Sequence, residues 1–580
     1  MREKKGISDF AETTSCLLGL ALTCAIVAGA QERPARPQVL SNAVTNQPIA
    51  FDTSVPLRDL PVKAVPSAGN QPIDPPLLPK LGSMQAAAPQ GASVGIAASQ
   101  SLSGPLIGVT VGLSFDGVGE NKTNNCPNVA GFTVAPPDTN GAVGDTQFVQ
   151  WVNVCYAVFD KATGALIAGP FPGNHFWAGF NPLCETPNDG DIIIQWDKAN
   201  HVWVAFQNFF GPRTFFSRRG TGPYGTCVAV SQTADATGSY NRYMFRQPGF
   251  PDYPKWGLTP DVYYQTQNDF GPAGKSFVGV NVCAYDGAAM RAGTAAKQIC
   301  ILDDSNGTLF DDSMLPADND YASSPGETPP QEVLLGSIDN FFPGDTHVYE
   351  YVFTVSFEGK GSATLAGVNG SMPISVPGFN LALCAPAGFL TLACVPQPGV
   401  TDLLDTLGDR LMYRLAHFDD GATHHFLVTH SVNNSTAVAA RWYEFQAPDT
   451  SPAALVLSQS GNTPDDGKYR WMGSVARDKY GDIALGYSRS SAAAGDYPSL
   501  YLSGQTAGEA AGTTDSETLV FAGSGSQSDT GGRWGDYSSM ALDGVDSCTF
   551  WYTNEYYPAT ASFAWNTRIA GQIRFPSCLE

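Results

Sequence analysis

The chain has 580 residues, of which 43% are hydrophobic and only 15% are charged, so it can bury a large core. Its 61 glycines and 42 prolines exclude a mostly helical protein and are typical of many short strands joined by tight turns. The net charge of −22 would repel a phosphate backbone, and no run of lysine and arginine opposes it, so we expect no nucleic-acid partner.

Residues 1–30 follow the order of a secretory signal peptide. A basic start precedes an apolar run from Cys16 to Val27, and the small residues Ala28-Gly29-Ala30 offer a cleavage site. The apolar run is too short to cross a bilayer, which leaves a short buried helix as the alternative to a signal. We therefore expect a protein without a membrane span that is secreted into the periplasm, onto the cell surface or into the medium.

Residues 31–105 are rich in proline, alanine, glutamine and serine and show no regular periodicity. This composition predicts a disordered linker. Apolar and aromatic content rises beyond it and stays high, so we expect one folded domain over residues 106–580.

Ten cysteines remain once Cys16 and Cys24 leave with the signal peptide. An even number of cysteines in an exported protein predicts disulfides, and their spacing does not fix the connectivity. Only short-range pairs can be suggested, such as Cys384 with Cys394.

One pattern recurs along the predicted domain: a short apolar strand, a tight turn with an aspartate, then a strand of aromatic and β-branched residues. Copies begin at Gly141, Asp191, Trp256, Leu411, Met472 and Tyr537. Their spacing leaves room for two further strands each, which predicts an all-β fold, a single β-propeller of four-stranded blades. Seven blades are expected if the long gap after the third copy holds a degenerate one; six blades with an insertion, or a sandwich array, are the alternatives.

The last copy ends in "RIAGQIRF", which is one strand short of a blade. The segment "GVTVGLSFDG" at the start of the domain can supply that strand and close the ring, hiding both sheet edges. In the last copy, "WGDYSSMALD" is expected as the innermost strand. The aromatic residues of "CTFWYTNEYY" are expected to pack mainly between blades.

Several stretches resemble a group of secreted bacterial β-propeller proteins that is loosely grouped with sialidase-like propellers carrying Asp-box repeats. They are "PPDTNGAVGDTQFVQWVN", "PNDGD", "FPDYPKWG", "RWGDYSSM" and "CTFWYTNEYY". The similarity covers residues 106–580 and implies the fold and export rather than a reaction. The chain lacks the Arg-Ile-Pro motif and a complete Asp box of true sialidases, so the resemblance does not imply sialidase activity.

Charged residues lie just before the predicted innermost strands, and the sign of their charge differs between the early and the late copies. Early copies offer the acids Asp138, Asp191 and Asp252, and late copies offer the arginines Arg410, Arg470 and Arg533. Closure of the ring would make the two arcs face each other at the mouth of the central channel. Three guanidiniums there could bind an anion, while carboxylates could act as general acid and base. A structural ring of salt bridges is the alternative.

The sequence predicts no metal site and no cofactor, with Ca²⁺ on the loops "DTNGAVGD" and "NDGD" as the alternative. His424, His425 and His430 lie on one strand pair without an accompanying metal-binding motif. Catalytic residues are not identified, although Glu555 on a second strand, beside Tyr556, is a candidate for the site.

Two functions remain open. We favour a monomeric extracellular propeller that binds a glycan or anionic polymer at the channel mouth without chemistry. The alternative is a glycan-active enzyme, a glycosidase or lyase, that uses the same mouth.

Overall fold

The structure is a computed structural model. It describes residues 37–62, 69–70, 109–120, 124–211, 220–304, 312–321, 331–337, 345–382, 384, 391–449, 451 and 453–579. The predicted signal peptide and residues 31–36, 63–68 and 71–105 of the predicted linker lie outside the described residues. The unit that begins at Pro37 is described by itself.

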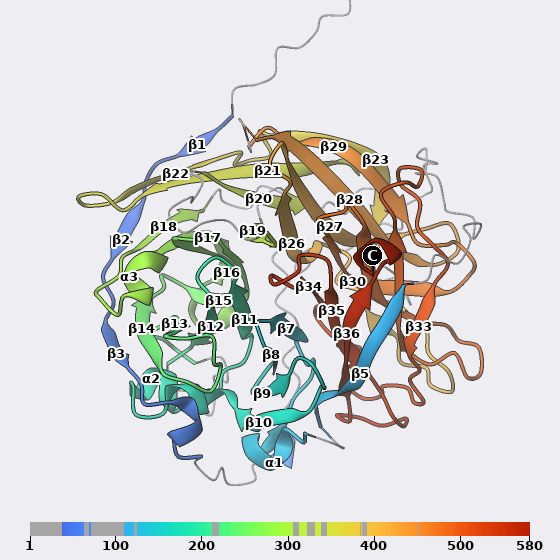
Figure 1. Ribbon diagram of the computed structural model, residues 1–580, viewed down its shortest axis with the longest axis horizontal. Helices are drawn as coiled ribbons and strands as arrows, with labels where there is room; N and C mark the ends of the chain where they lie inside the picture. The colour runs from blue at the N-terminus through green and yellow to red at the C-terminus, as the bar shows by residue number, and fades with distance from the viewer. Residues whose placement is uncertain are drawn as a thin grey trace, which may run out of the picture. The chain divides into compact units, whose positions relative to one another are not determined.

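Within this unit most elements are antiparallel strands that follow one another in four-stranded meanders (Figure 1). The first meander contains β7 (Asn140–Val143), β8 (Gln147–Val152), β9 (Cys155–Asp160) and β10 (Leu166–Pro172). The second contains β11 (Ile193–Asp197), β12 (Val202–Phe209), β13 (Gly225–Ser231) and β14 (Tyr240–Arg246). The third contains β15 (Phe250–Leu258), β16 (Val262–Phe270), β17 (Phe277–Asp286) and β18 (Gln298–Asp303).

The middle of the chain forms one larger sheet of ten strands. Its first part contains β19 (Leu315–Asn319), β20 (Gln331–Ser337), β21 (Asp345–Ser356) and β22 (Ser362–Ala366). Its second part contains β26 (Leu411–Asp419), β27 (Thr423–Asn433), β28 (Val438–Pro448) and β29 (Val456–Asn462). A parallel pairing of β19 with β26 joins the two parts, and β23 (Pro373–Leu381) bridges β21 and β27.

Two meanders complete the domain. One contains β30 (Tyr469–Arg477), β31 (Ile483–Ser490), β32 (Ser499–Gln505) and β33 (Thr518–Phe521). The other contains β34 (Ser539–Leu542), β35 (Phe550–Tyr556), β36 (Asn566–Arg574) and, as its outermost strand, β5 (Thr110–Gly119). The predicted closure is therefore confirmed, because β5 pairs antiparallel with β36 from Thr110 opposite Arg574 to Gly119 opposite Asn566.

The remaining elements are short. Two-stranded sheets pair β24 (Ala393–Val395) with β25 (Leu404–Asp405) and β4 (Gly69–Asn70) with β6 (Phe132–Thr133). The helical turns are η1 (Leu57–Asp59), α1 (Pro127–Ala130), η3 (Gly173–Trp177), α2 (Pro182–Glu185), η4 (Pro272–Gly274), α3 (Gly287–Arg291) and η6 (Pro576–Cys578). Among the described residues, no helix is both long and apolar enough to cross a membrane.

The sheets form a β-propeller, because their innermost strands contact one another in a closed cycle. The order of contact is β7, β11, β15, β19, β26, β30, β34 and back to β7. Strands such as β8 and β12 are buried on both faces, as expected when each sheet is covered by its neighbours. Bulky rings fill these interfaces: Phe148 of β8 stacks on Trp551 of β35 with centroids 5.1 Å apart. The expected core role of Phe550, Trp551 and Tyr552 is confirmed.

The prediction of a disordered linker is wrong for residues 37–62. Three short strands in this stretch extend the outer edges of successive sheets: β1 (Val39–Leu40) pairs with β22, β2 (Val44–Asn46) with β18, and β3 (Ala50–Thr53) with β14. Figure 1 shows this segment running past the three sheets. Their partner strands are distant in the sequence, so the local residue pattern did not predict these three strands.

Five disulfides link the ten cysteines of the domain. The pairs are Cys126–Cys155, Cys184–Cys227, Cys283–Cys300, Cys384–Cys394 and Cys548–Cys578. The predicted pair of Cys384 with Cys394 is confirmed. A set of this size is typical of proteins that fold in an oxidising compartment.

Candidate functional site

The entrance to every innermost strand carries a residue with left-handed backbone conformation. Within or just before the seven strands these are Asp138, Asp191, Tyr253, Ser313, Leu407, Met472 and Asp536, with φ between 41° and 57°. Such values are uncommon for residues other than glycine. Because the conformation recurs around the ring, it brings side chains from separate sheets to the same end of the central channel, here called the channel mouth.

Two acids at this mouth interact directly. Asp138 and Asp191 come from the first and second meanders, and a hydrogen bond joins their side chains. Burial raises the pKa of Asp138 well above its usual range, and the neighbouring Asp191 raises it further. Burial also raises the pKa of Asp191, whereas the hydrogen bond from Asp138 lowers it. The two carboxyl groups therefore influence each other, and the pKa of Asp138 is raised more strongly than that of Asp191.

A buried ion pair from the last meander lies beside these acids. The Nε atom of Arg533 donates to Oδ1 of Asp536 at 3.1 Å, and its Nη2 atom donates to Oδ2. Burial lowers the pKa of Arg533, but the carboxylates of Asp536, Asp405 and Asp138 more than offset this, so the guanidinium stays charged. The acid pair and this ion pair meet although nearly 400 residues separate them.

A lysine and two tyrosines complete the cluster, and a third tyrosine lies at its edge. The Nζ atom of Lys255 lies 3.4 Å from the ring centroid of Tyr253, 4.1 Å from that of Tyr537 and 5.9 Å from that of Tyr413. It donates to the carbonyl of Pro254 at 3.0 Å. Burial lowers the pKa of Lys255 to about 7, against the opposing effect of Asp191, Asp138 and Asp536. We call Asp138, Asp191, Lys255, Arg533, Asp536, Tyr253 and Tyr537 the mouth cluster.

Of the predicted arginines, Arg410 reaches the edge of this cluster. Its guanidinium lies 4.6 Å from the ring centroid of Tyr253 and is chelated by the adjacent Asp409, at 3.0 Å and 2.6 Å. Its charge also lowers the pKa of Lys255. Arg410 therefore belongs to the wall of the mouth.

The structure places Arg470 elsewhere, so three converging arginines do not form. Its Nε and Nη2 atoms donate to Glu517 at 2.5 Å and 2.8 Å, and its Nη1 and Nη2 atoms donate to Asp466. Arg489 donates to the same Glu517. The expectation that Arg470 lies at the mouth with Arg410 and Arg533 was wrong, because nearby carboxylates bind its guanidinium.

Glu555 supports the mouth from β35, and Asp252 lies on β15. Glu555 is fully buried, and its Oε2 atom accepts from the backbone amide of Gly535 at 2.7 Å. Burial and the charge of Asp536 raise its pKa well above the usual range. Glu555 thus positions the loop that carries Asp536. Asp252 is half-buried on β15 and pairs in register with Asn268.

Sequence reasoning missed Lys255, Tyr253, Tyr537 and Asp536. All four lie within "FPDYPKWG" and "RWGDYSSM", so the signal was present in the motifs. In β15 the register shifts between Asp252 and Lys255, and the left-handed Tyr253 lies at this bulge. A bulge changes which side chains share a face, so counting back from a regular strand selected the wrong neighbours.

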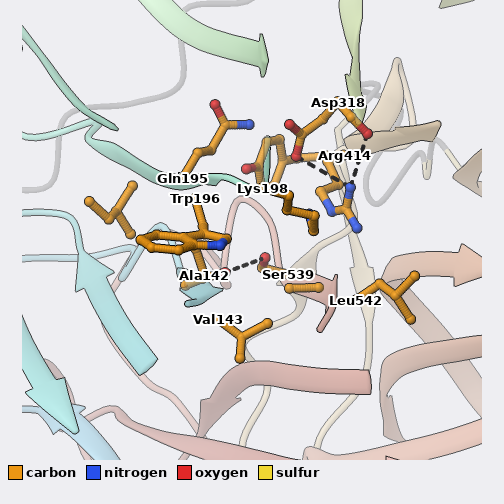
Figure 2. Close-up of a pocket in the computed structure, with 13 residues that line it drawn as sticks. Ala142, Val143, Gln195, Trp196, Lys198, Asp318, Arg414, Ser539 and Leu542 are labelled. Atoms are coloured by element: carbon orange, nitrogen blue, oxygen red, sulfur yellow. Dashed lines mark hydrogen bonds and ion pairs between the residues drawn. The ribbon is translucent and has the colours of Figure 1, made fainter. Parts of the chain in front are cut away.

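A small cavity of about 20 Å³ lies further along the innermost strands (Figure 2). Its lining includes Gln195, Trp196, Lys198, Asp318, Tyr413, Arg414 and Ser539. Arg414 pairs with Asp318 at 3.3 Å and with Asp320, which also pairs with Lys198 at 3.0 Å. The volume accommodates about one water molecule, so this cavity is too small for a sugar ring.

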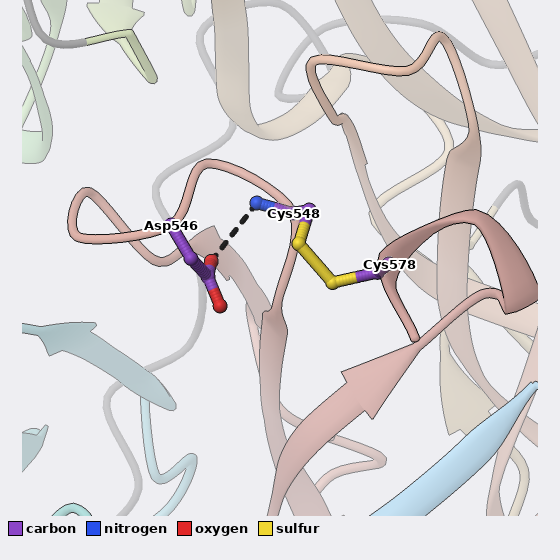
Figure 3. Close-up of side chains that lie close together, drawn as sticks. All are labelled: Asp546, Cys548 and Cys578. Atoms are coloured by element: carbon purple, nitrogen blue, oxygen red, sulfur yellow. Dashed lines mark hydrogen bonds between the residues drawn. A yellow bond between two sulfur atoms is a disulfide. The ribbon is translucent and has the colours of Figure 1, made fainter. Parts of the chain in front are cut away.

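One of the two clusters of potential metal ligands among the described residues is ruled out by chemistry. It combines Asp546 with Cys548 and Cys578, but these cysteines form a disulfide and offer no thiolate (Figure 3). Asp546 instead accepts from the backbone amide of Cys548 at 2.9 Å. Within the described part of the chain, neither cluster includes the acids of the loops considered for Ca²⁺.

No known protein family matches the sequence, and no curated protein matches it. Among solved structures, the chain is similar to the polysaccharide lyase Uly1 (10% identity, 80% of this chain and 98% of that chain, TM-score 0.37). It is also similar to Drosophila Semaphorin 1b (7%, 80% and 87%, 0.34) and to Trypanosoma rangeli sialidase (10%, 67% and 54%, 0.29). At these identities a likeness concerns the fold alone, so we argue function from the residues of the mouth.

Proposed function

We propose that the protein is exported and binds a glycan at the channel mouth. The observation that carries this proposal is the convergence of Asp138, Asp191 and the Arg533–Asp536 pair from three separate sheets. Sugar hydroxyls both donate and accept hydrogen bonds, and a set of carboxyl and guanidinium groups offers partners for both roles. Asp191 is partly exposed and gives a ligand its first contact.

The charges of the mouth cluster favour a hydroxyl-rich glycan over a strongly anionic polymer. Arg533 and Arg410 are each chelated by a neighbouring carboxylate. An incoming sulfate or carboxylate would have to compete with Asp536 or Asp409 for these donors. Neutral hydroxyls can instead bind to the outer oxygens of the existing ion pairs without breaking them.

A second candidate function is cleavage of the bound glycan, which two observations favour. Burial raises the pKa of Asp138 well above its usual range, so this carboxyl could act as the acid that protonates a departing glycosidic oxygen. Lys255, with a pKa of about 7, is largely an uncharged amine at mildly alkaline pH and could act as a base. In a lyase the base removes the proton beside a uronate carboxylate, the bond to the glycosidic oxygen breaks, and a carbon–carbon double bond forms.

We interpret the propeller as having seven repeating units rather than six. The closed cycle contains seven innermost strands, and each entrance carries a left-handed residue. The pairing of β19 with β26 merges two of these units into one sheet. A monomeric state and the absence of a nucleic-acid partner remain predictions.

The test is a glycan-array screen of residues 31–580 with parallel assays for reducing-end release and for unsaturated products. We expect binding that Asp191→Asn weakens at least tenfold, because asparagine keeps the shape but cannot accept as a carboxylate. Asp160→Asn, in an exposed turn of the first meander, is the control and should bind normally. Binding that survives Asp191→Asn unchanged would exclude the mouth, and product formation would favour cleavage over binding alone.

A further inference from the structure

A second cluster of polar residues lies at the turn between β26 and β27, away from the mouth cluster. Asp419 ends β26 and stands opposite His424 of β27 in the strand register. Asp449 follows the end of β28, and its backbone amide donates to the carbonyl of Ala422 in the same turn at 3.2 Å. One donor atom from each of Asp419, His424 and Asp449 lies within 4.8 Å of one from each of the others.

A chain of hydrogen bonds fixes the imidazole of His424. The Oδ1 atom of Asn319 lies 2.7 Å from Nδ1 of His417, so this nitrogen carries the hydrogen. The opposite nitrogen of His417, Nε2, then accepts from Nδ1 of His424 at 2.9 Å. In neutral His424 the Nε2 atom therefore carries the lone pair, the form in which histidine binds a metal.

This lone pair faces a carboxylate oxygen of Asp449 rather than a hydrogen-bond donor. Nε2 of His424 lies 3.6 Å from Oδ1 of Asp449, beyond hydrogen-bond length. Oδ2 of Asp419 lies 4.0 Å from Nδ1 of the same ring. The His424 side chain is only 8% exposed, so bulk water does not solvate the site freely. A cation among these three groups would offset the repulsion between their oxygen and nitrogen lone pairs.

The neighbouring His425 provides a contrast within the same strand. Its Nδ1 atom lies 2.8 Å from Oε1 of Glu444 and its Nε2 atom 3.1 Å from Oδ2 of Asp420. Both distances are within hydrogen-bond range, so this imidazole bridges two carboxylates in a closed arrangement. His424 is not enclosed in this way: its Nδ1 atom is oriented by His417, and its Nε2 atom faces Asp449 at 3.6 Å.

We propose that Asp419, His424 and Asp449 bind a divalent transition metal such as Zn²⁺. Ligand atoms about 2.1 Å from one zinc ion lie roughly 3.4 Å apart at the tetrahedral angle, which fits the 3.6 Å between His424 and Asp449. His417 is the positioning residue that orients the ligand. The ion would tie the β26–β27 turn to the end of β28, so its effect is on stability.

The experiment uses residues 31–580 without a polyhistidine tag, treated with a chelator, dialysed and titrated with Zn²⁺ by calorimetry. We expect one ion per chain and a higher melting temperature with Zn²⁺ than without. Asp449→Asn should weaken binding at least tenfold and remove the increase in melting temperature. Because the Asp449 side chain is 56% exposed, this variant should fold even if His424→Ala does not.

His201→Ala is the matched control, since His201 forms an exposed pair with Asp145 at 2.9 Å without a third ligand. This variant should bind Zn²⁺ like the wild type. Substitution with Co²⁺ gives a second readout, because tetrahedral nitrogen and oxygen ligands produce a visible absorption band. Absence of Zn²⁺ binding, or binding that Asp449→Asn leaves unchanged, would overturn the proposal.

Discussion

The ammonium nitrogen of Lys255 lies 3.4 Å above the ring of Tyr253, and both residues come from the bulged part of β15. Burial lowers the pKa of Lys255 to about 7, although the nearby carboxylates of Asp191 and Asp138 oppose this shift. The ring of Tyr253 is a further partner for the charged form.

Lys255 should make stability rise with pH in the alkaline range. Its pKa is lowered from 10.5 to about 7 in the folded state, so between these values the unfolded chain binds more protons than the folded one. Folding is therefore favoured as pH increases from 7 toward 10. In urea titrations at pH 7 and pH 9.5, the free energy of unfolding of the wild type should gain on the order of 3 kcal/mol relative to Lys255→Met. An equal pH dependence of both proteins would contradict the lowered pKa.

Asp269 should make the free energy of unfolding fall as pH rises, which is the opposite of the effect of Lys255. It is buried on β16, accepts from Nε2 of Gln267 at 2.7 Å, and burial raises its pKa to about 7. Between about pH 4 and pH 7 the folded state binds more protons, so this residue destabilises the fold as pH rises. The free energy of unfolding should fall less in Asp269→Asn than in the wild type between pH 4.5 and pH 7.5. The difference should be on the order of 3 kcal/mol.

The control for this measurement is Asp160→Asn. Asp160 lies in an exposed turn, and hydrogen bonds from Thr163 lower its pKa. Its contribution to stability is present at neutral pH and is lost as pH falls. Removing it should therefore slightly reduce stability at neutral pH, and should leave the decline that Asp269 causes unchanged.

Gln150 should control the closure of the propeller. Its Oε1 atom accepts from the amide of Val118 in β5 at 2.7 Å, and its Nε2 atom donates to Thr553 and Thr567 at 2.7 Å and 2.9 Å. Gln150→Leu removes the acceptor of the buried Val118 amide and the donor to both threonine hydroxyls, and should cost about 2–4 kcal/mol. Hydrogen exchange should accelerate in β5 first. Gln147→Leu, on the same strand and bonded to Asp235 and Ala236, should destabilise the protein without that preference for β5.

The N-terminal strands should be required for stability. Arg242 is 3% exposed and is chelated by Asp52 of β3 at 2.9 Å and 2.7 Å, while Leu57 is buried. A chain that begins after Val62 would leave this guanidinium without its carboxylate and expose three sheet edges. We expect a lower melting temperature and aggregation for this truncation, but little change for a chain that begins at Pro37. Identical melting curves for the two truncations would refute this role.

A smaller change tests the same segment without a deletion. Leu57→Ala should cost about 2–4 kcal/mol, because the site is buried and cannot fully collapse around alanine. Val55→Ala, at a position that is 55% exposed in the same segment, should change the melting temperature little. Equal effects of the two substitutions would argue against burial as the cause.

Local patterns in the sequence determined the repeating part of this protein. The alternation of short strands, aspartate turns and aromatic strands predicted the innermost strands β7, β11, β15, β26, β30 and β34, but not β19 in the long gap. The pattern is local because strand pairing within one meander involves neighbours in the chain, such as β34 and β35. The pairing of β5 with β36 could also be predicted, since a missing strand at one end matched a spare strand at the other. Asp138, Asp191 and Arg533 were found because each stands ahead of a strand entrance.

Only the tertiary structure determined the remaining features. The residues that fix them are distant in the sequence or are shifted by a bulge. Residues 37–62 lack a strand pattern of their own and form strands only where β14, β18 and β22 offer free edges. Lys255 enters the mouth because the bulge at Tyr253 changes the facing of β15. Arg470 is the second residue of β30, whereas Arg533 precedes β34, and Glu517, 47 residues further along, binds the Arg470 guanidinium. Position in the sequence thus identified the candidate residues. The carboxylates that lie near each arginine then determined whether it lies at the mouth or stabilises its own sheet.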